Sequence, residues 1–397
     1  PAQRTCYMLA VVALAAWLGR ATSASRVLAA ALLAVLLFDP WAVLAPGFWL
    51  SFGAVALILY VSAGRLGRFH WLAEWGRVQW AVTLGMAPLL LVLFQQVSLL
   101  SPLANALAIP VVSFVVTPLA LVGALLPWEA PLLLAHQAMA ACMALLEPLA
   151  RLPAAVWTEH APPAWALLLA LAGVVWMLLP RGFPARWLGG LAFLPLFFGL
   201  PPGPAAGEMR VAVLDVGQGL AVVVRTEHHV LLFDTGPRFG PTADAGARVV
   251  APYLVATGVR HLDGMLVSHD DIDHTGGTAS VASLFPPGWL LSSLPAGHAF
   301  QRLAPTSSRC EAGIRWTWDG VAFEVLSPPP QRYVEEGVRD NALSCVVRVR
   351  APGGSVLLTA DIQHDTEDWL ARTRVLPPTD VLVVPHHGSR SSSSPAL

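Results

Sequence analysis

Long apolar stretches without a charged side chain dominate the first half of the chain. The longest runs from residue 78 to 128, and since about 20 apolar residues cross a bilayer, it is long enough for two helices that form a hairpin. Other charge-free runs cover residues 5–19, 27–38, 40–64, 130–146, 161–180 and 188–207. Backbone groups in hydrocarbon need partners within their own segment, so these runs should be helices. The pattern predicts a multi-pass helical membrane domain over residues 1–200, with seven or eight membrane segments.

Polar side chains inside these apolar runs are candidates for lining a path through the membrane. Polar groups at membrane depth normally face a cavity or a partner helix. The candidates are Gln95, Gln96, Ser98, Ser101 and Asn105. Hydrogen bonding between packed helices is the alternative role for them.

The pattern changes after the Pro- and Gly-rich sequence GLPPGPAAGE at 199–208, and we expect a hinge at 201–209. Short β-rich runs follow at 210–216, 220–225, 229–233, 263–267, 344–350, 355–359 and 380–384. Helix-like stretches lie near 246–257, 276–284 and 364–373. Strands that alternate with helices are typical of a layered α/β domain, which we expect over residues 210–397.

Composition supports a membrane protein, because 55% of the residues are hydrophobic and 12% are charged, against about a quarter charged in soluble domains. The net charge of -1 excludes a global basic field that would recruit nucleic acid. Seven arginines lie in three short loops: Arg20 and Arg26, then Arg65, Arg68 and Arg77, then Arg181 and Arg186. The positive-inside rule places these loops in the cytoplasm. If 27–38 and 188–200 both cross, the α/β domain lies outside the cytoplasm; if 188–200 lies in the interface, the domain stays inside.

Four cysteines form no C-x-x-C pair, which argues against a zinc ribbon or redox motif. Cys6 and Cys142 fall in apolar runs and are expected to be core residues. Cys310 and Cys345 both fall in the polar half. A bridge between them is conceivable if this half faces an oxidising compartment.

Carboxylate and imidazole side chains follow several of the predicted strands directly. Asp234 follows LLF, the cluster His269 to His274 follows GMLVS, Asp361 follows VLLTA, and His386 and His387 follow VLVVP. Loops at one edge of a sheet commonly carry such sites. Asp234 alone could be a turn former and Asp361 alone a helix cap. Together, however, so many carboxylates would repel one another without a cation, so the set predicts a divalent metal site.

The motifs carry a resemblance to a known fold and family. SHDDIDHTGG resembles the H-x-H-x-D-H motif of the metallo-β-lactamase fold, with TADI and PHHGS matching its later ligand motifs. With VLDVGQG, FDTG and NALS, the set is similar to the C-terminal domain of the ComEC family, inner-membrane channels for DNA uptake in competent bacteria. The runs at 39–60 and 101–123 resemble that family's competence transmembrane region. The resemblance implies a helical membrane domain followed by an αββα sandwich.

The resemblance also implies a function and partners. The chain would be a channel for single-stranded DNA in natural transformation, with a metal-dependent nuclease that hydrolyses the non-transported strand. Its partners would be single-stranded DNA, membrane lipid and proteins of the uptake machinery, with the oligomeric state left open. The alternatives are a non-catalytic domain that gates the pore and a membrane-anchored phosphoesterase of the cell envelope. An N-terminal portion and the end of the hydrolase domain would be missing, so we expect a longer form to be more stable.

Residue roles follow from the same resemblance. The implied metal ligands are His269, Asp271, Asp273, His274, Asp361 and His386, and the implied catalytic residues are Asp273, Asp361 and His387. Which of His386 and His387 binds the metal stays open. Supporting residues are Asp215, Asp234, Asn341, Ser344 and Ser389.

The sequence departs from the parent motif at two ligand positions. Asp271 stands where the parent motif has its second histidine, and His298 is the lone candidate for the third histidine. Additional oxygen ligands favour Mn²⁺, with Zn²⁺ or Mg²⁺ as alternatives and one or two ions bound.

Overall fold

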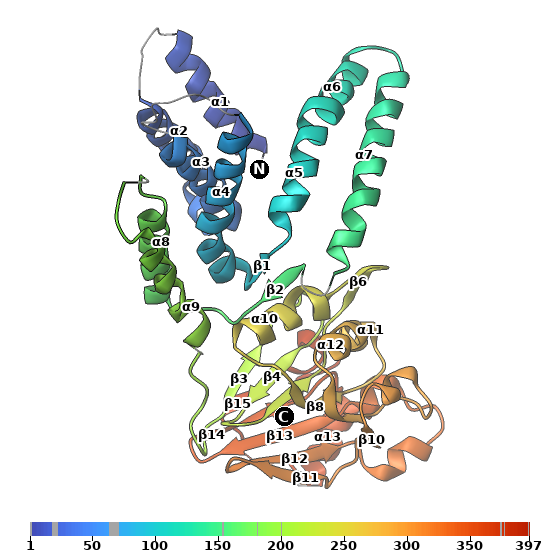
Figure 1. Cartoon of the computed structure of the whole chain (residues 1–397). Coiled ribbons are helices and arrows are strands. Elements are labelled where there is room, and N and C mark those ends of the chain that lie inside the picture. Colours follow the sequence, from blue (N-terminus) through green and yellow to red (C-terminus); the bar gives the residue numbers. More distant parts are fainter. Residues whose placement is uncertain are drawn as a thin grey trace. The chain divides into compact units, whose positions relative to one another are not determined.

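The computed structural model describes residues 2–17, 23–62, 71–152, 155–180, 182–199, 201–373, 375–376, 378–395 and 397. The chain forms two compact units, Pro1–Leu200 and Pro201–Leu397 (Figure 1). The first unit is helical, and the second consists of two β-sheets with helices.

Three long apolar helices distinguish the first unit. They are α4 (Trp71–Phe94), α5 (Ser101–Val111) continued through a π-helical turn (Val112–Val116) into α6 (Thr117–Leu125), and α7 (Ala130–Ala150). By length and composition each can cross a membrane. The other apolar helices of this unit are shorter: α1 (Ala2–Trp17), α2 (Ala24–Phe38), α3 (Pro46–Ser62), α8 (Ala164–Met177) and the stretch Arg186–Phe198.

Within the described residues, three helices are long and apolar enough to cross a membrane, whereas the sequence predicted seven or eight membrane segments. The run at 27–38 belongs to α2, which has 15 residues. The run at 188–200 forms a 3₁₀ segment, Arg186–Phe193, and the four-residue helix α9 (Pro195–Phe198). Both are shorter than the roughly 20 residues of a crossing. The arginine pattern alone consequently no longer decides on which side the second unit lies.

The charge-free run from 78 to 128 forms two helices, as expected, but a short strand separates them. Strand β1 (Gln96–Ser98) pairs antiparallel with β2 (Val156–Thr158). Gln95 adopts a left-handed φ of 55° just after α4, and its side-chain amide donates to the carbonyl of Val92 at 2.8 Å. Gln95 and Gln96 therefore lie outside the helices predicted for this run, and their role as channel-lining candidates stays a prediction. Asn105, half-buried on α5, remains a candidate for a channel lining.

The second unit is built on two sheets that face each other. The first has the order β10-β9-β8-β5-β4-β3, and the second has the order β11-β12-β13-β14-β15. The strands of the first sheet are β3 (Arg210–Val213), β4 (Val222–Arg225), β5 (Val230–Phe233), β8 (Leu262–Val267), β9 (Pro287–Ser292) and β10 (Thr306–Arg309). Those of the second are β11 (Arg315–Trp318), β12 (Val321–Ser327), β13 (Val346–Ala351), β14 (Gly354–Leu358) and β15 (Val381–Leu382).

Alternating side chains explain why the sheets stack in this way. Val222 and Val224 of β4 join Val347 and Val349 of β13 in the core between the sheets. Val223, on the opposite face of β4, packs in the core under the helices α10 (Ala251–Ala256) and α12 (Thr278–Leu284). The helix α13 (His364–Arg372) covers the outer face of the second sheet through Leu370. These four layers confirm the predicted αββα sandwich (Figure 1).

Parallel pairing sets where the polar loops emerge. Strand β5 pairs parallel with β8 in the first sheet, and β14 pairs parallel with β15 in the second. The carboxyl ends of parallel strands meet at one edge of a sheet. Asp234, the 268–274 loop, Asp361 and the 385–388 turn each follow one of these four strands. The fold therefore brings together the loops that the sequence pattern singled out.

Candidate metal centre

Four side chains from three loops converge on one point. One donor atom from each of Asp273, His274, Asp361 and His387 lies within 4.8 Å of the corresponding atoms of the other three. Two ligands bound to one ion at about 2.0–2.6 Å lie at most about 5 Å apart. These four side chains therefore have the spacing of a shared coordination sphere.

His274 and Asp234 form the buried base of this cluster. His274 Nδ1 donates to Asp234 Oδ2 at 2.8 Å, and its Nε2 lies 3.1 Å from Asp361 Oδ1. Asp234 also accepts from the Ser268 backbone N–H at 2.7 Å and from the Ser268 hydroxyl at 2.6 Å. Burial lowers the pKa of His274, but the carboxylates of Asp234 and Asp361 outweigh burial and raise this pKa to about 10.

His387 joins the two carboxylates on the open side of the cluster. Its Nε2 lies 3.2 Å from Asp273 Oδ2 and 3.2 Å from Asp361 Oδ2. The Asp273 and Asp361 carboxylates accept from the His387 ring and raise the pKa of His387 to about 9, and the same contact lowers the pKa of Asp273. Burial would raise the pKa of Asp361, yet the neighbouring His274 and His387 rings hold it below the usual range.

Two buried ring nitrogens without hydrogen-bond partners indicate whether a cation fits this site. Within the described residues, His269 Nε2 and His274 Nε2 have no hydrogen-bond partner. Asp271 Oδ2 lies 3.2 Å from the first and Asp361 Oδ1 lies 3.1 Å from the second, without hydrogen-bond geometry. An unsatisfied buried polar atom costs about 1–3 kcal/mol. A divalent ion would relieve this cost at both nitrogens, so the donor set fits a metal.

His269 stands beside the four-residue cluster rather than in it. Its ring centroid lies 4.3 Å from that of His274, and its Nδ1 is 2.9 Å from the Ser268 hydroxyl. Burial lowers the pKa of His269, and the neighbouring His274 lowers it further. The lowered pKa favours the neutral ring, which is the form that binds a metal. The Asp271 carboxylate is about half exposed next to it, with 44% of the side chain accessible.

Backbone strain is concentrated at the same place. Asp234, Ala360, His386 and His387 have φ between 48° and 55°, and they are four of the eight described non-glycine residues with positive φ. Such conformations cost of order 1–3 kcal/mol each and persist where the surrounding structure fixes them. The left-handed conformations turn the loops after β5, β14 and β15, so that the polar side chains of these loops lie close together.

The GQG turn supports Asp273 from the other side. Gly219 has a φ of 136°, and a Cβ at this position would lie 2.3 Å from the Asp273 carbonyl oxygen. The Leu220 N–H donates to the same carbonyl oxygen at 3.2 Å. Asp215 instead accepts from the Gly217 N–H at 3.3 Å and is exposed, so it stays outside the cluster.

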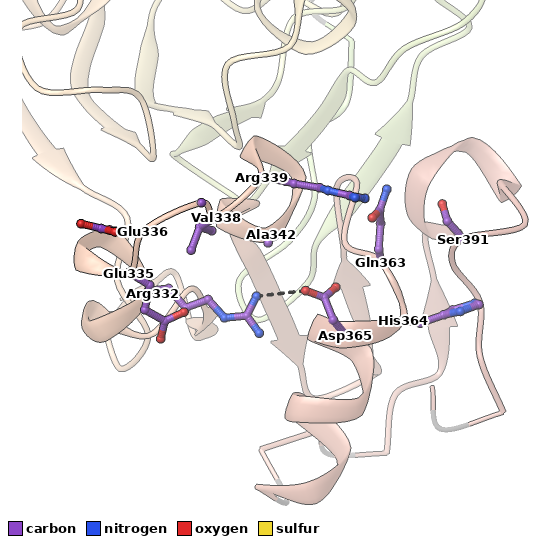
Figure 2. Close-up of a pocket in the computed structure, with 11 residues that line it drawn as sticks. Arg332, Glu335, Glu336, Val338, Arg339, Ala342, Gln363, His364, Asp365 and Ser391 are labelled. Atoms are coloured by element: carbon purple, nitrogen blue, oxygen red, sulfur yellow. Dashed lines mark hydrogen bonds and ion pairs between the residues drawn. The ribbon is translucent and has the colours of Figure 1, made fainter.

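His386 lies one step further from the centre than His387. Its Nε2 is 3.8 Å from Asp361 Oδ2, while its Nδ1 lies 3.0 Å from the Ser391 hydroxyl and 3.4 Å from the Gln363 amide nitrogen. Figure 2 shows Gln363 and Ser391 on the wall of a hollow. The Ser389 N–H donates to the His386 carbonyl at 2.8 Å, which closes the turn. The geometry therefore favours His387 over His386 as the inner residue of the pair.

The remaining predicted residues lie at the periphery. The Ser344 N–H donates to the Asn341 carbonyl at 3.1 Å, and the buried Ser344 hydroxyl has no partner within the described residues. His298 Nδ1 accepts from the Phe300 N–H at 3.2 Å, and its Nε2 lies 3.7 Å from Asp270. His298 is therefore directed at Asp270, outside the four-residue cluster.

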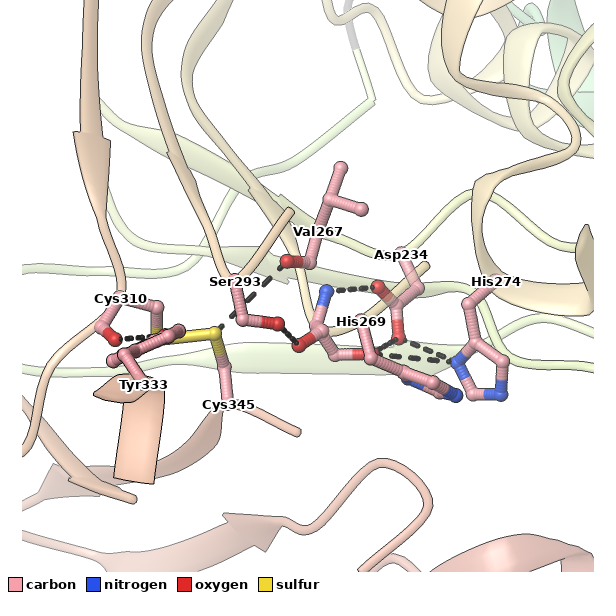
Figure 3. Close-up of a disulfide and its surroundings, with 9 residues drawn as sticks. Asp234, Val267, His269, His274, Ser293, Cys310, Tyr333 and Cys345 are labelled. Atoms are coloured by element: carbon pink, nitrogen blue, oxygen red, sulfur yellow. Dashed lines mark hydrogen bonds and ion pairs between the residues drawn. A yellow bond between two sulfur atoms is a disulfide. The ribbon is translucent and has the colours of Figure 1, made fainter. Parts of the chain in front are cut away.

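A disulfide between Cys310 and Cys345 joins the two sheets beside the metal loop (Figure 3). Both cysteines are fully buried. The Cys345 N–H donates to the Ser268 carbonyl at 3.1 Å, and the Cys310 N–H donates to the Ser292 carbonyl at 2.9 Å. The bridge thus fixes the start of β13 against the residue that precedes His269. Composition raised this bridge as conceivable, but only the fold shows its place next to Ser268.

Comparisons with known proteins give a consistent assignment for both units. Residues 1–184 match the family described as "Competence protein", and residues 214–397 match the "Metallo-beta-lactamase superfamily". The chain is 39% identical to "Competence protein ComA" of Neisseria gonorrhoeae, over 99% of this chain and 54% of that protein.

Two further relatives align over most of the chain. Identity is 32% with "Uncharacterized protein YcaI" of Escherichia coli, covering 99% of this chain and 52% of the relative. Identity is 30% with "Recombination protein 2" of Haemophilus influenzae, covering 91% of this chain and 50% of the relative. The chain thus spans about half the length of the curated relatives it matches. The competence match, together with three long apolar helices, indicates a membrane protein.

Proposed function

We propose that the chain takes up single-stranded DNA through the inner membrane in natural transformation, because its two units match a competence-protein family and the metallo-β-lactamase superfamily. The helices of the first unit would provide the path, with Asn105 as a candidate lining residue. The second unit would be a metal-dependent nuclease that hydrolyses the non-transported strand. Single-stranded DNA, membrane lipid and other uptake proteins would be its partners.

The observation that carries the nuclease is the convergence of Asp273, His274, Asp361 and His387 within 4.8 Å. A divalent ion bound there, for which the oxygen ligands favour Mn²⁺ over Zn²⁺ or Mg²⁺, would polarise a phosphoryl oxygen and lower the pKa of water. His269 and Asp271, beside this set, are the candidate ligands of a second ion.

The protein's own residues would orient both the metal and the substrate. Because a carboxylate only accepts, Asp234 would keep a proton of His274 on Nδ1, and Nε2 would lose its proton and bind the metal ion through its lone pair. The His274 and Asp361 side chains are 0% and 5% exposed, whereas those of Asp273 and His387 are 23% and 27% exposed. A phosphodiester would therefore approach from the side of Asp273 and His387, which would contact its oxygens.

A cleavage assay tests this function on the full chain in detergent micelles. We expect Mn²⁺-dependent hydrolysis of end-labelled single-stranded DNA by the wild type. His387→Ala should reduce the rate by at least about a hundredfold, because loss of even an outer-shell partner costs 10–100-fold. His386→Ala, its neighbour in the same turn, should retain more activity because its Nε2 lies further from Asp361. Equal rates for both variants and the wild type would refute this site.

The disulfide supports placing the second unit outside the cytoplasm. Disulfides form and persist in oxidising compartments and are rare in the cytosol. Cys310 and Cys345 form one within the core of this unit. We therefore propose that the second unit faces the non-cytoplasmic side of the inner membrane.

Labelling of a single introduced cysteine checks this side. Ser307 is exposed on the edge strand β10 and is therefore suitable for labelling. Ser307→Cys, with Cys6 and Cys142 replaced and the disulfide kept, should react with a membrane-impermeant maleimide in intact spheroplasts. Reaction only after lysis would place the unit in the cytoplasm.

A non-catalytic gating domain is the second candidate function. It is favoured by the position of His298, which is directed at Asp270 and supplies no further histidine to the cluster. The cleavage assay separates the two functions, because a gating domain would bind Mn²⁺ without cleaving DNA. Hydrolysis of a small phosphodiester but not of DNA would instead indicate the envelope phosphoesterase.

A further inference from the structure

A hollow of about 590 Å³ opens beside the metal centre, within the size range of small-ligand sites. One wall comes from the segment 332–342, and the facing wall comes from residues 363–365 at the start of α13 and from Ser391 (Figure 2). The metal-centre ligands proposed above do not line it.

Two residues of the facing wall connect the hollow to the metal centre. Gln363 and Ser391 both approach His386 Nδ1, at 3.4 and 3.0 Å. The opposite ring nitrogen of His386 lies 3.8 Å from Asp361 Oδ2. One imidazole ring therefore separates the hollow from the cluster, and an extended ligand held at the metal could continue into it.

The two arginines that line the hollow differ in whether a carboxylate neutralises them. Arg332 is paired with Asp365 at 3.4 Å and with the Thr366 hydroxyl at 3.2 Å, so these charges largely cancel. Arg339 forms no ion pair within the described residues, and its side chain extends toward Gln363 (Figure 2). Glu335 and Glu336 also line the hollow, but Figure 2 shows Glu336 pointing away from Arg339. The corner between Arg339, Gln363 and Ser391 therefore offers the Arg339 guanidinium as its cationic hydrogen-bond donor.

A second hollow, of about 230 Å³, contacts the other side of the metal loop and provides a comparison. Arg309 lines it, with its guanidinium 4.6 Å from the centre of the Tyr333 ring. Asp270 and Asp340 line it as well. Two carboxylates against one arginine oppose the binding of a phosphate there. The larger hollow carries carboxylates too, but Asp365 is paired with Arg332 and Glu336 points away from Arg339, so the Arg339 corner is the better anion site.

We propose that the Arg339 corner binds the phosphate of the nucleotide next to the scissile phosphodiester, with that nucleotide seated in the larger hollow. A guanidinium fork suits a phosphate because it donates two parallel hydrogen bonds. The inference rests on the proposed nuclease function and adds to it a second contact with the substrate strand. The substrate is a polynucleotide strand, which fills the hollow while its neighbouring phosphate lies at the metal.

The test measures binding of fluorescein-labelled oligothymidylate to the full chain in detergent micelles, by anisotropy in EDTA at several NaCl concentrations. Arg339→Ala should weaken binding roughly tenfold and reduce the slope of log affinity against log salt by about one. Arg339→Lys should restore the slope but only part of the affinity. The control is Arg372→Ala, because Arg372 is exposed on α13 and lines neither hollow. It should bind like the wild type.

A second measurement separates binding in the hollow from binding elsewhere on the chain. An oligonucleotide that carries 5-iodouracil should crosslink to residues 332–342 or 363–365, as mapped by peptide mass spectrometry. Unchanged affinity and salt slope in Arg339→Ala, with crosslinks only in the first unit, overturn the inference. If the wild type cleaves no DNA but its binding depends on Arg339, the proposed nuclease function is refuted and nucleotide binding at the Arg339 corner is supported.

Discussion

Replacement of Asp361 by alanine should abolish divalent metal binding by the second unit and, with it, any metal-dependent hydrolysis. Asp361 is the carboxylate that both cluster histidines share, at 3.1 Å from His274 Nε2 and 3.2 Å from His387 Nε2. Loss of an outer-shell partner already costs 10–100-fold in metal affinity. Loss of a residue in the centre should therefore reduce the affinity for Mn²⁺ by more than about a hundredfold.

Electron paramagnetic resonance of free Mn²⁺, titrated with the purified chain, measures this loss directly. The matched control is Asp368→Ala, which removes an exposed carboxylate of the following helix α13 that pairs only weakly with Arg372, at 3.5 Å. The control should bind Mn²⁺ like the wild type. Wild-type affinity in Asp361→Ala would show that the cluster does not hold the ion.

Much of the candidate site could be predicted from the sequence, because its polar side chains follow buried strands. Asp234, the 269–274 cluster and Asp361 each come directly after an apolar run. Parallel pairing of β5 with β8 and of β14 with β15 then places these ends together. The αββα layering follows from the same alternation of apolar runs.

The inner position of His387 could not be predicted, because the two histidines are adjacent and chemically identical. Left-handed φ values of 50° at His386 and 53° at His387 turn the chain so that His387 meets both carboxylates. The sequence PHHGS has no pattern that predicts these left-handed conformations. The hollow at Arg339 could not be predicted either, because its walls come from segments separated by 20 or more residues.

Several strands were missed for different reasons. Strand β12, VAFEVLS, alternates between buried and partly exposed residues over its first four positions, and this short period of two could have been detected in the sequence. Strand β10, TSSR, is an exposed edge strand without apolar residues, so no pattern distinguishes it from a loop. In the first unit, hydropathy detects apolar runs but not where helices end, so it did not predict that only three of the described helices reach the length of a crossing.

Removal of the Asp234 carboxylate should destabilise the second unit more than any surface substitution. Asp234 is fully buried and accepts from the Ser268 N–H, the Ser268 hydroxyl and His274 Nδ1, all within 2.8 Å. Asp234→Ala leaves these donors without an acceptor, and it places alanine at a φ of 55°. Breaking such a buried network costs about 3–5 kcal/mol. For a unit of this size, that lowers the melting temperature by roughly 10 °C.

Asp234→Asn separates the stability effect from the effect on the metal. Asparagine tolerates positive φ and keeps one carbonyl acceptor, so the melting temperature should fall by less than in Asp234→Ala. The amide no longer fixes the His274 proton on Nδ1 as a carboxylate does, so Mn²⁺ affinity should still fall by about 10–100-fold. Thermal unfolding followed by tryptophan fluorescence and Mn²⁺ titration of both variants, with Asp368→Ala as control, measure the two effects. If Asp234→Asn kept wild-type Mn²⁺ affinity, Asp234 would have a structural role alone, because the network would then stabilise the loop without positioning His274 for the metal.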